Sequence, residues 1–263
     1  MSDMAMSSGE TKTHTIKTKV IVIVFFVLCA IFLVELILYK FALPSMRQPK
    51  IILSGATRIS ETRATELLSP VKNDTWFSFD VEKAASIISS LPIVESVSVS
   101  KRFPDTIFIS VVERESVALT FAEIGGKSRA LSIDKNGVLF YDASVETQSY
   151  ALPIVSGMPI EHLSEGMRIP AKYRALIEQI SEIKNIDEKY FASLAEICVL
   201  PKEYGNYELM LIPAKTQTRV LTDRALNEDA LQYMMVVLDV VSSIEPNVSL
   251  IDLRYGSVSY RTR

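Results

Sequence analysis

The first apolar stretch of the chain is continuous, whereas the apolar positions after it recur with the spacing of helices and strands. Residues 20–39 read VIVIVFFVLCAIFLVELILY and carry a single charge, on Glu35. As an α-helix rising about 1.5 Å per residue, this stretch would span roughly 30 Å, the thickness of a bilayer hydrocarbon core. Lys19 and Lys40 flank it at headgroup depth. The pattern predicts a transmembrane helix over residues 20–39 that contacts membrane lipid.

A cleaved signal peptide is the alternative to a retained anchor. Its apolar region would run about 7–15 residues and end in a small-x-small site, whereas this stretch is longer and is followed by KFALP, a poor cleavage site. Charge does not orient the helix, because three basic residues lie on each side of it. The short polar head, residues 1–19, favours a cytoplasmic N-terminus and an exported tail. Glu35 either reaches interfacial water or contacts a partner helix.

Residues 50–114 follow a linker over residues 40–49 and combine helix and strand periods. Ser60 and Asp80 can each cap a helix, and two segments of alternating apolar residues come after them. The order is β-α-α-β-β. A tight turn joins the last two strands, so we expect them to pair antiparallel with both helices on one face of the sheet. The predicted elements are a strand at 51–53, helices at 60–68 and 81–91, and strands at 94–101 and 106–113.

Residues 115–263 predict a second unit, in which short strands are interrupted by two amphipathic helices. Asn136-Gly137 marks a hairpin between two of the strands. The helices are expected over residues 171–185 and 229–244. The fold class is therefore α+β: a single N-terminal transmembrane helix, a β-α-α-β-β domain, and a mixed-sheet β domain with packed helices. The predicted strands cover 117–121, 130–133, 138–141, 194–200, 207–212, 219–221, 249–254 and 257–261, and residues 153–157 are a short buried strand or a turn. The buried stripe of the last helix is predicted to be Ala230, Met234, Val237, Val241 and Ile244.

Sequence motifs for enzyme chemistry are missing. The 28 basic and 31 acidic residues give a net charge of −3, which offers no general reason to bind nucleic acid. His162 is the one histidine of the tail, and Gly125-Gly126 lacks the strand–loop–helix context of a phosphate loop and is interpreted as a turn. Cys29 and Cys198 cannot meet in a disulfide, and Cys198 is interpreted as a buried small residue. We predict no catalytic, metal or cofactor site, and interpret the chain as a binding or scaffolding protein.

Four motifs, in order behind the predicted membrane helix, resemble those of the FtsQ/DivIB family of bacterial division proteins. The first is IILSG at 51–55, similar to the opening strand and glycine turn of a POTRA domain. The second is LPIVESVSVSKRFPDTI at 91–107, continued by ISVVER at 109–114. The third is IDKNGVLF at 133–140 with LPIVSG at 152–157, and the fourth is IDLRY at 251–255.

The resemblance implies a POTRA-like domain over residues 50–114 and an FtsQ-type β domain over residues 115–263. It implies a non-enzymatic, single-pass scaffold in the cytoplasmic membrane that recruits and links FtsB- and FtsL-type partners and other divisome components for septal wall synthesis. The partner site of the family, an exposed C-terminal edge strand near a terminal Arg-Tyr, carries over to Arg254 and Tyr255. The expected partner-binding residues are Arg254, Tyr255, Gly256, Ser257, Val258, Ser259 and Tyr260.

This site has a physical rationale and a structural alternative. A terminal edge strand offers unpaired backbone groups to a partner strand, Arg254 could hold a partner carboxylate, and Tyr255 and Tyr260 supply contact area. Alternatively, Arg254 pairs with Asp252, which shares its strand face, and both tyrosines pack within the fold. Two other functions stay open: a POTRA-bearing translocation or assembly factor that binds client polypeptides, and an anchored hydrolase, which the missing motifs disfavour.

Overall fold

The structure is a computed structural model that describes residues 10–71, 74–124, 126–144, 152–160, 162–186, 191–223 and 225–263. Residues 1–9 of the predicted cytoplasmic segment and Gly125 lie outside these ranges. The chain divides into two compact units, which are described separately. The first comprises residues up to 54, 61–86 and 98–110, and the second comprises 55–60, 87–97 and 111–263.

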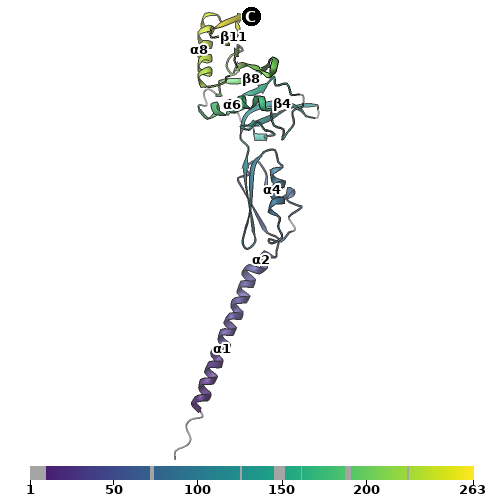
Figure 1. Ribbon diagram of the computed structural model, residues 1–263, viewed down its shortest axis with the longest axis vertical. Helices are drawn as coiled ribbons and strands as arrows, with labels where there is room; N and C mark the ends of the chain where they lie inside the picture. The colour runs from purple at the N-terminus through teal and green to yellow at the C-terminus, as the bar shows by residue number, and fades with distance from the viewer. Residues whose placement is uncertain are drawn as a thin grey trace, which may run out of the picture. The chain divides into compact units, whose positions relative to one another are not determined.

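An N-terminal helical segment begins the first unit (Figure 1). It consists of α1 (Glu10–Ile37), a π-helical turn η1 (Leu38–Ala42) and α2 (Leu43–Ser45). Among the described residues, Lys19–Ser45 is the one helix long and apolar enough to cross a membrane. The Ser45 hydroxyl donates to the carbonyl oxygens of Phe41 and Ala42 at 3.0 and 2.9 Å, which holds the last turn together. The helical segment therefore continues past Tyr39 and includes residues 40–45 of the predicted linker.

A three-stranded sheet with two helices follows in the predicted order β-α-α-β-β. Its sheet order is β1-β3-β2, and β1 runs parallel to β3 from the pair Lys50↔Thr106 to the pair Ser54↔Ser110. On β3 the side chains of Ile107, Ile109 and Val111 are buried, because a strand turns every second residue to the same face. The elements are β1 (Lys50–Ser54), α3 (Glu61–Leu67), α4 (Val81–Ser89), β2 (Val94–Arg102) and β3 (Thr106–Glu113).

The second unit is built on a nine-stranded mixed sheet. Its order is β12-β11-β10-β9-β8-β7-β4-β5-β6, with parallel pairs at β4–β7, β7–β8 and β10–β11 and antiparallel pairs elsewhere. The strands are β4 (Ser116–Ile124), β5 (Lys127–Asp134), β6 (Leu139–Phe140), β7 (Ile154–Ser156), β8 (Leu194–Pro201), β9 (Tyr207–Pro213), β10 (Arg219–Thr222), β11 (Val248–Asp252) and β12 (Ser259–Thr262). The fold is α+β, as predicted from the sequence.

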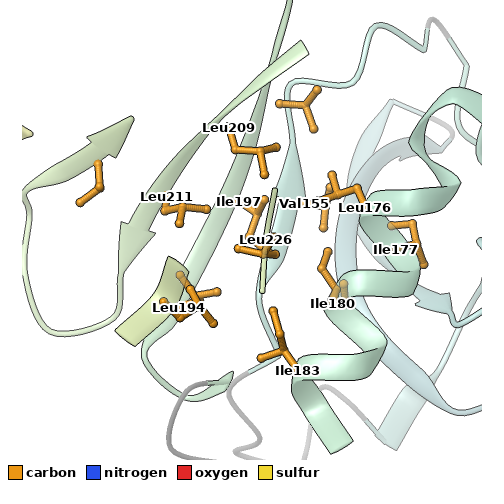
Figure 2. Close-up of a cluster of buried hydrophobic side chains, with 14 of the residues drawn as sticks. Val155, Leu176, Ile177, Ile180, Ile183, Leu194, Ile197, Leu209, Leu211 and Leu226 are labelled. Atoms are coloured by element: carbon orange, nitrogen blue, oxygen red, sulfur yellow. The ribbon is translucent and has the colours of Figure 1, made fainter. Parts of the chain in front are cut away.

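The core of the second unit lies between this sheet and its helices. The helix α6 (Arg174–Ile186), which follows the 3-10 turn η2 (Ala171–Tyr173), points apolar side chains toward the strands that carry Val155 and Ile197 (Figure 2). The labelled members of this cluster are Val155, Leu176, Ile177, Ile180, Ile183, Leu194, Ile197, Leu209, Leu211 and Leu226. Burial of such side chains is the main driving force for the fold, at about 1.5–3 kcal/mol for each fully buried side chain.

The second helix, α8 (Glu228–Ile244), begins at the cap residue Asn227, whose side-chain oxygen accepts a 2.8 Å hydrogen bond from the Ala230 amide. Its predicted buried stripe is partly wrong. Met234, Val237 and Val241 are buried, but Ile244 is 70% exposed and Ala230 is only half-buried. Leu231 and Leu238 take the central positions of the buried face and rotate it away from those two residues.

Two positions of the family-like motifs require glycine for a physical reason. Gly55 and Gly157 adopt φ values of +80° and +73°, which L side chains rarely adopt. A Cβ at Gly55 would overlap the carbonyl oxygen of Val111, and one at Gly157 would overlap that of Val199. Both turns therefore bring a glycine backbone directly against a neighbouring strand.

Candidate partner-binding site

The predicted site lies at the turn between β11 and β12 and on β12 itself. The turn covers residues 253–258, so Arg254 and Tyr255 lie in the connection and not on a strand. Gly256 has a φ of +71° with open space around it, which allows the chain to reverse there. The strand β12 then pairs antiparallel with β11 through Ile251↔Tyr260 and Asp252↔Ser259. The C-terminal end of the described chain lies close to β11 (Figure 1).

Arg254 is committed to two carboxylates of its own fold. Its Nε donates to Asp252 Oδ1 at 2.8 Å, its Nη2 pairs with the other oxygen of Asp252, and its Nη1 donates to Glu208 Oε2 at 2.7 Å. The structural ion pair expected between Arg254 and Asp252 is present. Because β9 carries Glu208, this one guanidinium ties the turn to a strand two positions away in the sheet.

The charges of this cluster stabilise one another. Hydrogen bonds from Arg254 lower the pKa of Asp252. Burial raises the pKa of Glu208, but hydrogen bonds from Lys202 and Arg254 outweigh it and leave that pKa below its usual value. The same contacts raise the pKa of Arg254 above the ordinary value for arginine. The turn therefore keeps its ion pairs throughout the physiological pH range.

The tyrosines of the turn and of β12 do not pack into the fold. Tyr255 is 73% exposed and Tyr260 is 53% exposed, and Val258 between them is also exposed. The guanidinium carbon of Arg254 lies 5.1 Å from the centre of the Tyr255 ring, so the same arginine also supports that ring. The alternative that both tyrosines merely pack is therefore wrong for the free chain.

The strand β12 is an edge of the nine-stranded sheet. It pairs with β11 on one side, and no other strand in the described part of the chain pairs with its second side. All four of its residues are exposed. An edge of this kind presents backbone N–H and C=O groups to a partner strand.

A groove lies on the face of strands β9–β12 that is opposite the buried core. The groove is not among the sites predicted from the sequence, although the alternation of Arg261 and Arg263 with Tyr260 and Thr262 is a signal for one basic strand face. Three of the lining residues are arginines, and no acidic residue lines the groove in the part of the chain that the structure describes. The groove is lined by Met210, Ile212, Thr216, Gln217, Arg219, Leu221, Ser249, Leu250, Arg261 and Arg263.

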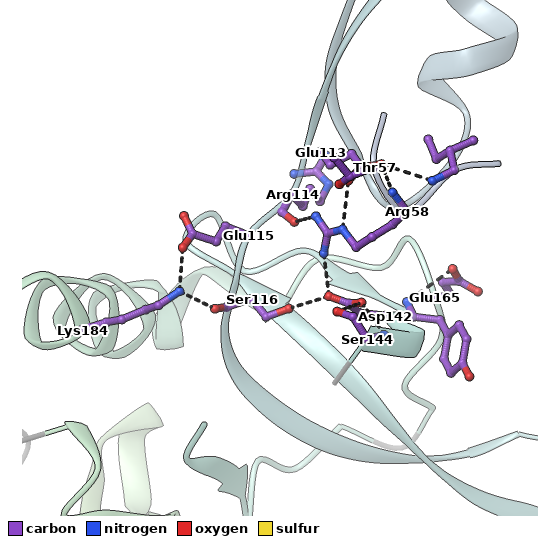
Figure 3. Close-up of polar contacts among 12 residues, drawn as sticks. Thr57, Arg58, Glu113, Arg114, Glu115, Ser116, Asp142, Ser144, Glu165 and Lys184 are labelled. Atoms are coloured by element: carbon purple, nitrogen blue, oxygen red, sulfur yellow. Dashed lines mark hydrogen bonds and ion pairs between the residues drawn. The ribbon is translucent and has the colours of Figure 1, made fainter. Parts of the chain in front are cut away.

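A second polar cluster, within the second unit, centres on Arg58 (Figure 3). The guanidinium donates to Glu113 at 3.0 Å, to Asp142 at 2.5 Å and to the Arg114 carbonyl oxygen. Thr57 donates its hydroxyl to Glu113 at 2.7 Å. The carboxylates are 5% and 4% exposed, so this is a buried ion network. It contains Glu113 and Arg114 of the family-like ISVVER motif, and sequence analysis gave no role to Arg58.

Opposing effects set the pKa values in the Arg58 cluster. Burial raises the pKa of Glu113, but hydrogen bonds from the Thr57 hydroxyl and the Arg58 amide, together with the Arg58 guanidinium, bring it below its usual value. Burial likewise raises the pKa of Asp142, and hydrogen bonds from Ser144 with the charge of Arg58 lower it overall. The cluster is thus held as ion pairs at neutral pH, which is the arrangement of a structural network.

The sequence residues considered for chemistry do not come together. His162 is exposed, and the described residues contain no group of three or more His, Cys, Asp or Glu side chains that could hold a metal ion. Cys29 and Cys198 are both free, and Cys198 is half-buried where the sequence predicted burial. Gly126 lies at the tip of the β4–β5 hairpin, as the turn interpretation requires.

Known proteins of bacterial cell division are similar to parts of this chain. The family described as "POTRA domain, FtsQ-type" matches residues 46–114. The chain is 30% identical to the cell division protein FtsQ of Koribacter versatilis over 165 residues, which are 61% of this chain and 44% of that protein. It is 24% identical to the cell division protein DivIB of Staphylococcus aureus over 149 residues, which are 56% of this chain and 31% of that protein.

A third relative is the cell division protein FtsQ of Corynebacterium glutamicum, which is 28% identical over 43% of this chain and 54% of its own length. The matches thus span about a third to about half of the relatives' own lengths. Together with the N-terminal apolar helix, they indicate a single-pass membrane protein. The FtsQ-type POTRA match and these relatives support the resemblance of the chain to the FtsQ/DivIB family of cell division proteins.

Proposed function

We propose that this protein is a non-enzymatic scaffold of bacterial cell division. It holds FtsB- and FtsL-type partners, and through them other divisome components, at the site of septal wall synthesis. The relatives named as cell division proteins support the cellular role. The observation that carries the binding mode is the free edge of β12 beside the exposed Tyr255 and Tyr260.

The site favours a partner that contributes a β-strand. Backbone hydrogen bonds to the β12 edge supply affinity, and side chains on alternate faces of the added strand supply specificity. One face of that strand meets the groove with Arg219, Arg261 and Arg263, so acidic side chains suit it. The other face is on the side of Tyr260, where apolar side chains suit it.

Arg254 acts in this proposal mainly by positioning. Its guanidinium is already held by Asp252 and Glu208, so it fixes the turn and supports the Tyr255 ring. The proposed partner-binding set is Arg254, which positions the turn, with Tyr255, Gly256, Ser257, Val258, Ser259 and Tyr260. The protein needs no cofactor or metal for this role.

The binding test uses the full chain in detergent and the FtsB- and FtsL-like proteins of the same genome. Tyr255→Glu places a charge on the exposed turn and is expected to abolish co-purification of the partners. Tyr204→Glu is the matched control, because Tyr204 is an almost fully exposed tyrosine of the same unit that lies outside the site. Circular dichroism shows whether each variant folds. Unchanged capture by folded Tyr255→Glu would remove this surface from the proposal.

The proposed topology places the N-terminus in the cytoplasm and the tail outside the cytoplasmic membrane. A reporter enzyme that is active only outside the cytoplasm, fused after Arg263, is expected to be active. Fusion of the same reporter before α1 is the control and is expected to be inactive. If only the fusion before α1 is active, the orientation is opposite to the one proposed. The proposal that the tail binds partners outside the cytoplasm would then be wrong.

Depletion of the protein tests the cellular role. Loss of the scaffold should block septation while growth continues, so the cells should form filaments. The alternative, a POTRA-bearing translocation or assembly factor, predicts normal septation with mislocalised client polypeptides. Microscopy of depleted cells, with re-expression of the unchanged chain as the control, separates the two.

A further inference from the structure

An aromatic cluster in the first unit has no role in the proposed scaffold. Trp76 makes edge-to-face contacts with Phe77 and Phe103, at ring-centre distances of 5.2 and 5.5 Å. Phe103 in turn stacks on Phe41, with ring centres 5.6 Å apart and planes within 9°. We call these four residues the aromatic platform. It joins the end of the apolar helical segment to the first unit's folded part.

The platform leaves large apolar surfaces in contact with solvent. Phe77 is 62% exposed and Phe103 is 54% exposed. Phe41 and, a few residues on, Met46 are exposed as well. Isolated exposed apolar residues are ordinary, but a contiguous aromatic group marks an interaction surface.

Trp76 is the fixed centre of the platform. Its indole N–H donates to the Thr106 carbonyl oxygen at 3.2 Å, so the ring is anchored to β3. The ammonium of Lys101 lies 5.7 Å from the ring centre and donates to the Phe77 carbonyl oxygen at 2.8 Å. The rings of Phe77 and Phe103 are therefore presented on a rigid support.

Basic residues are neighbours of the platform in the sequence. Lys40 and Arg47 are exposed on either side of the helix end that carries Phe41, and Lys101 lies over the Trp76 ring. The carboxylate of Asp105, two residues after Phe103, is engaged by Lys50 at 3.5 Å and by the Thr106 hydroxyl at 3.1 Å. Aromatic rings with a basic rim match the lipid–water interface, where rings lie among headgroups and cations meet phosphates.

The position of the platform in the chain points to the same occupant. Phe41 belongs to the apolar helical segment Lys19–Ser45, and β1 begins at Lys50, so few residues separate the membrane segment from the platform. A bilayer that contains this helix would bring lipid headgroups within reach of Phe103, which Phe41 contacts directly.

We propose that the aromatic platform docks on the lipid interface of the membrane that holds the N-terminal helix. Phe77 and Phe103 enter the headgroup layer, and the exposed Lys40 and Arg47 contact lipid phosphate. Trp76 positions both rings. The tether and the platform together then restrict the first unit at the membrane surface. This inference rests on the membrane anchor but not on the identity of any division partner.

Trp76 is the only tryptophan of the chain, so its emission reports on the platform alone. The full chain is reconstituted into nanodiscs of phosphatidylcholine and phosphatidylglycerol, with or without lipids brominated near the headgroup. The measured quantity is the ratio of Trp76 emission in the two discs. Docking predicts a loss of emission in the brominated discs. Emission that is equal in both discs would overturn the proposal and leave the platform to solvent or to a protein.

Variants show whether the two phenylalanines make the contact. The double change Phe77→Ser and Phe103→Ser is expected to restore emission in brominated discs, whereas Phe77→Leu, which keeps an apolar side chain, is expected to retain the loss. Phe121→Ser removes an equally exposed phenylalanine of the second unit and should change nothing. Each variant is compared with itself in the two discs. A change in the intrinsic emission of Trp76 therefore does not affect the measured ratio.

The remaining outcomes are also decisive. The variant with both Phe77→Ser and Phe103→Ser is also checked by circular dichroism. If it is folded and its emission is still quenched in brominated discs, the role of Phe77 and Phe103 is overturned. Failure of the chain to enter nanodiscs at all would reject the membrane anchor and, with it, the docking. Neither result depends on capture of FtsB- or FtsL-type partners, so the failure of this inference is distinguishable from the failure of the proposed scaffold role.

Discussion

Arg58 Nη1 lies 2.5 Å from Asp142 Oδ2, although 84 positions separate the two residues in the sequence. The same guanidinium binds Glu113 at 3.0 Å and the carbonyl oxygen of Arg114. Figure 3 shows these contacts of Arg58. Arg114 itself donates to Asp134 at 2.5 Å and to the Pro92 carbonyl oxygen at 2.9 Å. Two arginines thus hold together the segments 55–60, 87–97 and 111–142 of the second unit.

Arg58→Met is expected to destabilise the protein strongly. The change leaves Glu113 and Asp142 as buried carboxylates without their counter-charge, and loss of one partner from a buried ion network costs about 3 kcal/mol. Urea unfolding of the full chain in non-ionic detergent, followed by circular dichroism, measures the change in the free energy of unfolding.

The matched control for Arg58→Met is Lys135→Met. Lys135 pairs with Glu95 at 3.0 Å, but its side chain is mostly in solvent, so its loss should change stability little. If the two variants unfold at the same urea concentration, the Arg58 network does not carry the stability assigned to it.

Acid should weaken the same network. Glu113 and Asp142 have pKa values below their ordinary 4.5 and 3.8, so the unfolded chain binds protons before the folded chain does. Their contribution is therefore complete above about pH 5 and is lost as the pH falls through the folded pKa values. Unfolding midpoints measured from pH 7 down to pH 3 should decline, and the decline should be shallower in Arg58→Met. A parallel decline in both proteins would contradict this origin.

The element pattern was largely predictable because local signals agreed with the tertiary structure. The alternation in ISVVER predicts β3, and Asn136-Gly137 predicts the turn between β5 and β6, in which Gly137 has a φ of +73°. The apolar spacing over residues 229–244 predicts the bounds of helix α8 to within a residue. The prediction of its buried face is less accurate, because the helix has more apolar residues than one buried face can hold.

The polar contacts were not predictable in the same way. The pair Arg254–Asp252 is predictable because its members are two positions apart, whereas Glu208 and Asp142 reach their arginines across 46 and 84 positions. A single sequence carries no signal for such partners, since charge alone fits many pairings. The aromatic platform was missed for the same reason, because Phe41, Trp76 and Phe103 come from three separate segments.

Gly157→Ala is expected to be far more damaging than Gly205→Ala. Both glycines have positive φ, at +73° and +77°, so both substitutions carry a backbone penalty of about 1–2 kcal/mol. At Gly205 the new methyl group meets open space, whereas at Gly157 it overlaps the Val199 carbonyl oxygen and approaches the sulfur of Cys198 at 3.1 Å. Thermal unfolding of the two variants measures the difference. Equal losses would show that β7 and β8 can separate there without cost.

Glu208→Gln tests whether Arg254 positions the partner site or contacts the partner itself. Glu208 holds Arg254 Nη1 at 2.7 Å and lies on β9, away from the turn. If Arg254 positions Tyr255, the loss of this carboxylate should loosen the turn and weaken capture of FtsB- and FtsL-like proteins. If Arg254 instead binds a partner carboxylate, release of its Nη1 from Glu208 should leave capture unchanged or strengthen it. We expect weaker capture with little loss of stability, and Glu203→Gln, an exposed acidic residue at the start of the η3 turn (Glu203–Gly205), is the control that should leave both unchanged. Capture at or above the level of the unchanged chain would reassign Arg254 from positioning to direct contact.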